Sequence, residues 1–173
     1  GELVKIDGNT IEVIKKSYES TATKVINLVK SIEKFAEENS DDPYLVAMAE
    51  RARMVQESFQ QRQTSTAEAL DEILAELARN EARKKEQAER GFDGLTYFVF
   101  KLLDDAGIGK ADEVSTKIRN AFTEFPNWKK SEASLRDLRK KVTFAIYAEC
   151  DDLNQVTGLV DNLFRILEKG DAS

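Results

Sequence analysis

Apolar residues recur every three or four positions along most of this chain, which is the spacing of one face of an α-helix. The first such series follows the turn-like residues 7–10 and continues to the polar stretch ENSDDP. Its members are Ile11, Ile14, Tyr18, Ala22, Val25, Val29, Ile32 and Ala36. The series predicts one long helix that buries a single face.

Helix start and stop signals divide the next part of the chain. Asp42 before Pro43 predicts the start of a second helix, because aspartate caps a helix and proline suits its first turn. Ser65 or Thr66 is expected to cap a third helix, which continues through a charged run at 79–90 and ends at Gly91. The apolar positions of these two helices are Leu45, Met48, Ala52, Val55, Phe59, Leu70, Ile73, Leu74 and Leu77.

After Gly91 the sequence becomes aromatic. The stretch TYFVF has the composition of a strand, but no second strand-like run exists to pair with it, so a short buried helix is favoured. A further helix is expected to end at Pro126, a basic one to begin at Ser131, and a last one to begin with the capping box of Asp152 and Gln155. The stripe of the last helix is Leu153, Val156, Val160, Leu163 and Leu167.

These elements predict an all-α fold, an irregular multi-helix bundle of about seven helices without a β-sheet. Residues 1–90 are expected to form a long-helix segment that ends in a charged helix. Residues 91–173 would then form a compact helical subdomain, or one domain continuous with the first part. Its core is expected to gather around Phe98, Phe100, Phe122 and Trp128. Trp128 is expected to pack between two helices there and join them. The alternative is an exposed tryptophan ring that stacks on a nucleic-acid base.

The amino-acid composition excludes several classes of catalytic and metal-binding site. The 173 residues contain no histidine and one cysteine, which excludes His-dependent triads, zinc sites with histidine ligands and internal disulfides. Neither GxxxxGK[ST] nor GxGxxG occurs. We therefore expect no catalytic residue, no metal site and no cofactor in this chain. No membrane-length apolar run or signal peptide is present, which favours the cytoplasm, and the start at Gly1 suggests a segment excised from a longer protein.

Carboxylate pairs and the single cysteine are the remaining candidates for chemistry. The pairs Asp41–Asp42, Asp104–Asp105 and Asp151–Asp152 stand where helices start or stop, so capping is the expected role, with magnesium binding as the alternative. Cys150 precedes two aspartates, whose negative charge disfavours a reactive thiolate.

Basic residues form two candidate contact regions for a partner or for DNA. The first is the turn and helix at 129–141, which contains six cations and only two acidic residues, Glu132 and Asp137. These cations are Lys129, Lys130, Arg136, Arg139, Lys140 and Lys141. The second is the charged run, with Arg83, Lys84 and Lys85. The basic helix is either a surface that binds a partner or DNA, or a solvated outer face. The charged run is either a strut that joins two subdomains or touches a partner, or a solvated helix end held by pairs such as Glu81–Lys85 and Glu86–Arg90. The net charge of −6 argues against a protein that coats nucleic acid over its whole surface.

Three segments, in order, resemble the C-terminal helical region of the motor (R) subunit of type I restriction enzymes. ERARMVQESFQQRQTSTAEALDEILAEL is similar to a helical run in that region, and ERGFDGLTYFVFKLLDDAGI resembles the junction that follows it. EFPNWKKSEASLRDLRKKVTFAIY resembles a later segment in which a tryptophan precedes a basic helix. The resemblance begins near residue 50, and residues 1–49 carry nothing distinctive.

The resemblance implies that this chain is one part of a longer protein whose catalytic functions belong to other domains. In that family the nuclease and helicase-like domains lie N-terminal to this region and hold the metal ligands, the catalytic lysine and the ATP-binding loop. This chain would be a non-catalytic assembly domain, and its parent an ATP-dependent, site-specific deoxyribonuclease. Its partners would be the methyltransferase and specificity subunits and the helicase domains of its own parent chain. The alternatives are a nucleic-acid-contacting module that uses the basic helix, and a free-standing regulatory or adaptor bundle.

Overall fold

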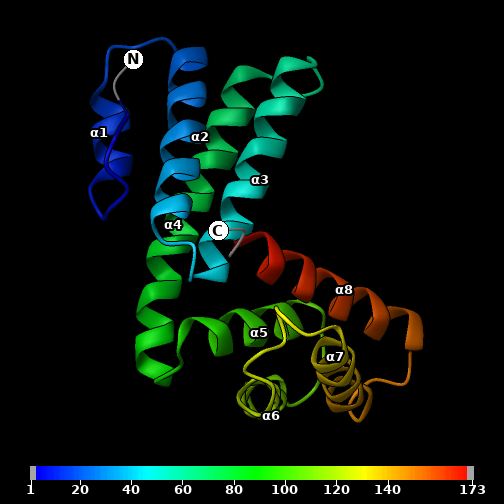
Figure 1. The fold of residues 1–173 in the computed structure, drawn as a ribbon. Helices are drawn as coiled ribbons and strands as arrows, with labels where there is room; N and C mark the ends of the chain where they lie inside the picture. The colour runs from blue at the N-terminus through cyan, green and yellow to red at the C-terminus, as the bar shows by residue number, and fades with distance from the viewer. Residues whose placement is uncertain (1–2, 171–173) are drawn as a thin grey trace. The chain divides into compact units, whose positions relative to one another are not determined.

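The computed structural model describes residues 3–170, and all regular secondary structure in that range is α-helical (Figure 1). The elements are α1 (Thr10–Lys16), α2 (Thr21–Glu38), α3 (Pro43–Gln60), α4 (Thr66–Arg90), α5 (Gly94–Asp105), α6 (Ala111–Glu124), α7 (Glu132–Tyr147) and α8 (Leu153–Gly170). The predicted all-α class is confirmed for this part of the chain, with eight helices where about seven were expected. None of the eight is long and apolar enough to cross a membrane.

The additional helix arises because the first predicted helix is broken into α1 and α2. Ser17 and Ser20 both have extended backbones, and the Ser20 side chain accepts a hydrogen bond from the Thr23 N–H at 3.2 Å. This cap starts a new helix, since serine satisfies the backbone better at a helix start than inside a helix. Tyr18 lies in the break and is 104% exposed, so its predicted place on the buried stripe was wrong.

Most of the predicted helix ends are where the capping chemistry placed them. Asp42 accepts a hydrogen bond from the Tyr44 N–H, and Ser65, not Thr66, caps α4. Gly91 ends α4 with a φ of 67°, in the left-handed region that glycine adopts without a steric cost. Asp93 caps α5, so two helices are separated by only a few residues.

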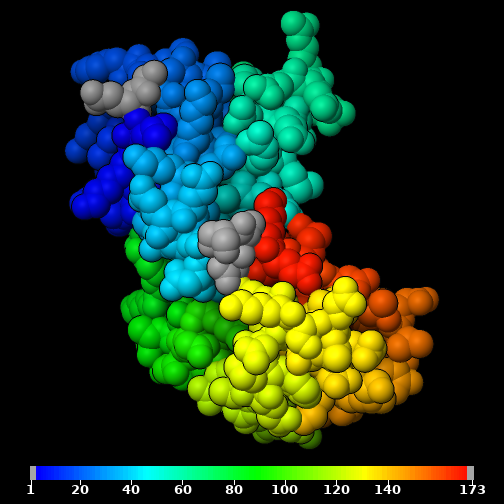
Figure 2. All heavy atoms as spheres, in the orientation of Figure 1, coloured from blue at the N-terminus to red at the C-terminus, as the bar shows by residue number. Residues whose placement is uncertain are grey.

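The chain divides into two compact units, residues 1–91 and 92–173, which Figure 2 colours from blue to green and from green to red. In the first unit, α2, α3 and α4 pack against one another and α1 packs against α4 (Figure 1). The core of this unit includes Val25, Leu28, Met48, Ala52 and Ile73, each of them completely buried. These are the positions of the predicted stripes, with Leu28 added between them.

In the second unit, four helices form a closed ring of contacts. α5 packs on α6, α6 on α7, α7 on α8, and α8 on α5. Phe122, Trp128 and Phe164 meet inside this ring, with centroids 5.6–5.8 Å apart. Phe164 was not among the predicted core residues, whereas Leu153, which was placed on the stripe of α8, is 59% exposed. Phe98 and Phe100 are buried as expected, and Phe100 contacts Phe92 and Tyr97.

Candidate functional site

Helix α7 presents a mixed basic and aromatic face to solvent. Its start is fixed by Ser131, whose side chain accepts a hydrogen bond from the Ser134 N–H. Leu138, Val142 and Ile146 form its buried side. Four of the exposed residues on the opposite side, here called the α7 outer stripe, are Arg136, Lys140, Phe144 and Tyr147. Their spacing places them within an arc of about 80° and along about 16 Å of helix.

Two of the predicted contact residues of α7 are used inside the unit. The Arg139 guanidinium donates to the carboxylate of Asp161 on α8 and lies 5.0 Å from the centroid of the Phe164 ring. Lys141 pairs with Glu124, the last residue of α6. Both pairs join α7 to a neighbouring helix at the surface, where an ion pair contributes little to stability.

The turn before α7 also packs inward. Trp128 is 9% exposed and is enclosed by Phe122 and Phe164, so its ring packs in the core and has no open face for a base. The Lys129 ammonium lies 5.3 Å from the centroid of the Trp128 ring. Lys130 is exposed beside it.

Arg136 and Lys140 differ from these cations because neither has an ion pair or hydrogen-bonded side-chain partner among residues 3–170. They are followed on the same face by Phe144 and Tyr147, which are 65% and 45% exposed. Sequence reasoning identified the two cations but missed the two aromatic residues. Phe144 lies four residues after Lys140, and Tyr147 lies three residues after Phe144. This spacing, on the side opposite Leu138 and Val142, was the signal that could have found them.

In the charged run of α4, some side-chain contacts differ from those predicted. Arg83 is 6% exposed and is not available to a partner in this structure, because its guanidinium is held within the first unit. Lys84 pairs with Glu81 at 2.9 Å, where Lys85 had been expected to do so. The predicted pair of Glu86 and Arg90 is present at 3.4 Å. Of the three candidate contacts in this run, Lys85 is the one left exposed without a partner among the described residues.

Arg83 is the centre of a buried polar network between α3 and α4. It donates to Asp42 at 2.8 Å, to Asn80 at 2.8 Å and to Gln87 at 2.9 Å. The guanidinium also lies 4.5 Å from the centroid of the Tyr44 ring. One arginine thus forms hydrogen bonds with the capping carboxylate of α3 and with two side chains of α4. The arrangement links the two helices and has a structural role.

Glu76 is the centre of a second polar network, about two turns earlier on α4. Its carboxylate receives two hydrogen bonds from Arg51, at 2.9 and 3.0 Å, and one from Arg79. Burial disfavours its charged form, but the hydrogen bonds and positive charge of Arg51 and Arg79 outweigh burial and lower the pKa of Glu76. Burial raises the pKa of the nearby Tyr44, and the negative charge of Glu76 adds to that effect against the opposing arginines.

The lowered pKa of Glu76 predicts a pH-dependent contribution to stability. A carboxylate with a depressed folded-state pKa stabilises the fold above its ordinary pKa, and that contribution is lost as the pH falls through the folded-state value. Glu76→Gln should therefore lower the free energy of unfolding at pH 7, and the difference from the unmodified chain should shrink below about pH 4. Urea unfolding followed by far-UV circular dichroism at pH 7, 5 and 3.5 measures this. A difference that stays constant across these pH values would contradict the assignment.

The carboxylate pairs and the cysteine have local roles. Asp42 and Asp152 accept hydrogen bonds from the backbone N–H groups of Tyr44 and Gln155, as expected for caps. Asp105 pairs with Lys101 at 3.3 Å. No group of three or more His, Cys, Asp or Glu residues able to hold a metal ion occurs within residues 3–170. The Cys150 thiol lies 3.3 Å from the side-chain oxygen of Gln155.

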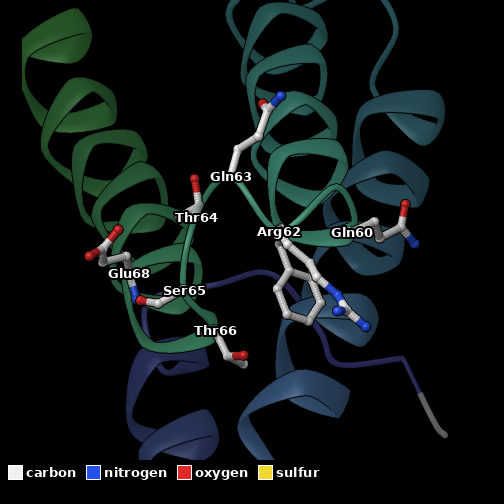
Figure 3. Close-up of a pocket in the computed structure, with 8 residues that line it drawn as sticks. Gln60, Arg62, Gln63, Thr64, Ser65, Thr66 and Glu68 are labelled. Atoms are coloured by element: carbon white, nitrogen blue, oxygen red, sulfur yellow. The ribbon is translucent and has the colours of Figure 1, made fainter.

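A hollow of about 740 Å³ lies at the α3–α4 turn (Figure 3). The turn is built by Arg62, whose φ of 60° places an arginine where glycine usually ends a helix, and by a hydrogen bond from the Gln63 N–H to the Ser58 carbonyl. Figure 3 shows that the labelled side chains Gln60, Arg62, Gln63, Thr64 and Thr66 point away from one another. Because the polar groups do not converge, this hollow has no arrangement that would bind a defined ligand.

Comparisons with known proteins return no relative. No protein-family model, no curated protein and no solved structure matches the chain.

Proposed function

We propose that this chain is a non-catalytic helical assembly domain in the motor (R) subunit of a type I restriction enzyme. It would dock the motor and nuclease subunit onto the methyltransferase core during ATP-dependent DNA restriction. The observation that carries the proposal is the α7 outer stripe, which exposes two cations without internal ion pairs next to two exposed aromatic rings. A folded domain gains nothing from such a face by itself, and a partner surface would cover it.

The resemblance found in the sequence supports the same function. Its three segments correspond to α3 with the start of α4, to the end of α4 with α5, and to the turn before α7 with α7 itself. The third segment contains the whole α7 outer stripe. One of the three segments that resemble the R subunit is therefore also the part with the exposed face.

Under this proposal the chain needs no cofactor and acts in the cytoplasm. ATP hydrolysis and DNA cleavage belong to the preceding domains of the parent chain. The exposed cations orient the approach of the partner, because electrostatic complementarity raises association rates more than it raises affinity.

Charge reversal on the stripe tests the proposal. Arg136→Glu with Lys140→Glu in the full-length subunit should slow association with the methyltransferase core by roughly tenfold at low salt, since a steering attraction becomes a repulsion. Surface plasmon resonance at two salt concentrations measures the rates. The matched control is Lys117→Glu with Arg119→Glu, two exposed cations of α6, which should leave association unchanged.

Equal association rates for the stripe variant and the α6 control would refute the proposal. Salt-dependent binding of the unmodified chain to DNA in the absence of the core, lost in the stripe variant, would favour the nucleic-acid module in its place.

A further inference from the structure

We infer that the α7 outer stripe binds an amphipathic α-helix of the partner, with Phe144 and Tyr147 as apolar anchors and Arg136 and Lys140 facing acidic residues of that helix. The inference rests on the proposed function and names the chemistry of the surface that docks there.

The aromatic residues provide the apolar half of the surface. Phe144 and Tyr147 are three residues apart, so their rings lie on one side of α7, and both are largely exposed. Aromatic side chains that are exposed in the free protein and covered in the complex dominate the energy of many interfaces. The tyrosine hydroxyl can remain hydrogen-bonded at the edge while its ring is covered.

The charges around the stripe are mixed. Arg136 and Lys140, with the exposed acidic residues Glu132 and Asp137 near them on the same helix, precede the aromatic pair, and the exposed Asp151 and Asp152 follow it. The turn between the aromatic pair and the two aspartates is short. Within it, the Cys150 N–H donates a hydrogen bond to the Tyr147 carbonyl at 3.3 Å. The C-terminal end of α7 adds the negative end of the helix dipole at the same place.

This mixture of charges favours a protein over a nucleic acid as the partner. The phosphates of a nucleic acid would be attracted by Arg136 and Lys140 but repelled by the neighbouring carboxylates, including the two aspartates at the aromatic end, where the bases would have to stack. A protein helix can carry acidic residues at one end, apolar residues in the middle and basic residues at the other end. It can therefore complement the whole stripe.

A helix is the partner element that fits the length and shape of the stripe. The four residues extend over about 16 Å on a single helix, which is about three turns. A partner helix packed along α7 would present its own residues at intervals of three and four to the same line.

The test uses the complete chain and a methyltransferase core. Phe144→Ser with Tyr147→Ser should weaken equilibrium binding to the core by about a hundredfold, as expected for the loss of two anchors. Met54→Ser, which changes a side chain that is 60% exposed on α3 of the first unit, is the matched control and should bind unchanged. Far-UV circular dichroism and the emission of Trp128 should be unaltered in both variants, because the substituted side chains are exposed.

A photoreactive benzophenone residue in place of Phe144 identifies what covers the stripe. Cross-linking followed by mass spectrometry should recover a helical segment of the core with acidic residues next to apolar ones. A cross-link to a non-helical segment, or to single-stranded DNA added as a probe, would overturn the inference.

The outcomes separate the inference from the function on which it rests. If the serine variant binds like the control while the charge-reversed variant is impaired, the inference is wrong and the assembly function stands. If the unmodified chain does not bind the core, the proposed function is wrong, and the inference is overturned with it.

Discussion

Phe164→Ala is expected to destabilise the second unit by about 3–5 kcal/mol, the usual cost of removing a fully buried phenylalanine. Phe164 is 1% exposed and lies on α8 where the ring of four helices closes. Its ring stacks on Phe122 at 5.7 Å and meets the edge of Trp128 at 5.6 Å. The Arg139 guanidinium covers it at 5.0 Å from the centroid. The substitution therefore removes contacts to α6, to α7 and to the turn between them at once.

Trp128 provides a direct measurement of this effect. It is the single tryptophan of the chain and belongs to the second unit, so urea unfolding followed by its fluorescence reports on that unit. Phe144→Ala, which removes an exposed phenylalanine ring from α7, is the control and should change the free energy of unfolding by less than about 1 kcal/mol. Similar losses in the two variants would show that the aromatic cluster does not hold this unit together.

The helical class and most helix ends were predictable because their causes are local. Asp42, Ser65, Asp93 and Ser131 cap helices through hydrogen bonds to backbone groups two or three residues away. Such signals are complete within a short stretch of sequence. The break at Ser17–Ser20 was missed because the apolar spacing continues across it, although the two serines are themselves a capping signal.

The outward-facing residues were harder to predict, because exposure depends on distant parts of the chain. Arg83 stands in a run of charges that looks solvated, and its burial depends on Asp42, 41 residues earlier. Arg139 and Lys141 pair at the surface with Asp161 and Glu124, which are 22 and 17 residues away in the sequence. Sequence spacing gives the side of a helix on which a residue lies, but it does not give the neighbour that covers that side.

The candidate site illustrates the same limit. Six cations near α7 were equivalent in the sequence, and the structure separates them by their contacts. Arg139 and Lys141 pair with Asp161 and Glu124, Lys129 lies against Trp128, Lys130 is exposed in the turn, and Arg136 and Lys140 remain on the outer stripe. The proposed docking surface is therefore smaller than the basic helix and includes two aromatic residues that charge alone did not indicate.

Arg83→Met is expected to destabilise the first unit by about 3 kcal/mol, because it removes one partner of a buried charge pair and leaves the other without compensation. The methionine would occupy much of the same volume but could not donate to Asp42, Asn80 or Gln87. Asn80 is 1% exposed, so its side-chain oxygen would lose its partner in a place that water does not reach. The contact of the guanidinium with the Tyr44 ring would be lost as well.

Far-UV circular dichroism during urea unfolding measures this loss, with Lys85→Met as a control that removes an exposed cation from the same helix. The control should change stability by less than about 0.5 kcal/mol. Asp42→Asn provides the decisive comparison, because asparagine can still cap α3 but carries no charge. In that background Arg83→Met should cost clearly less, since no carboxylate is left unpaired. An equal cost in both backgrounds would show that the charge of Asp42 contributes nothing to the pairing, and that the packing of Arg83 and its other hydrogen bonds account for the loss.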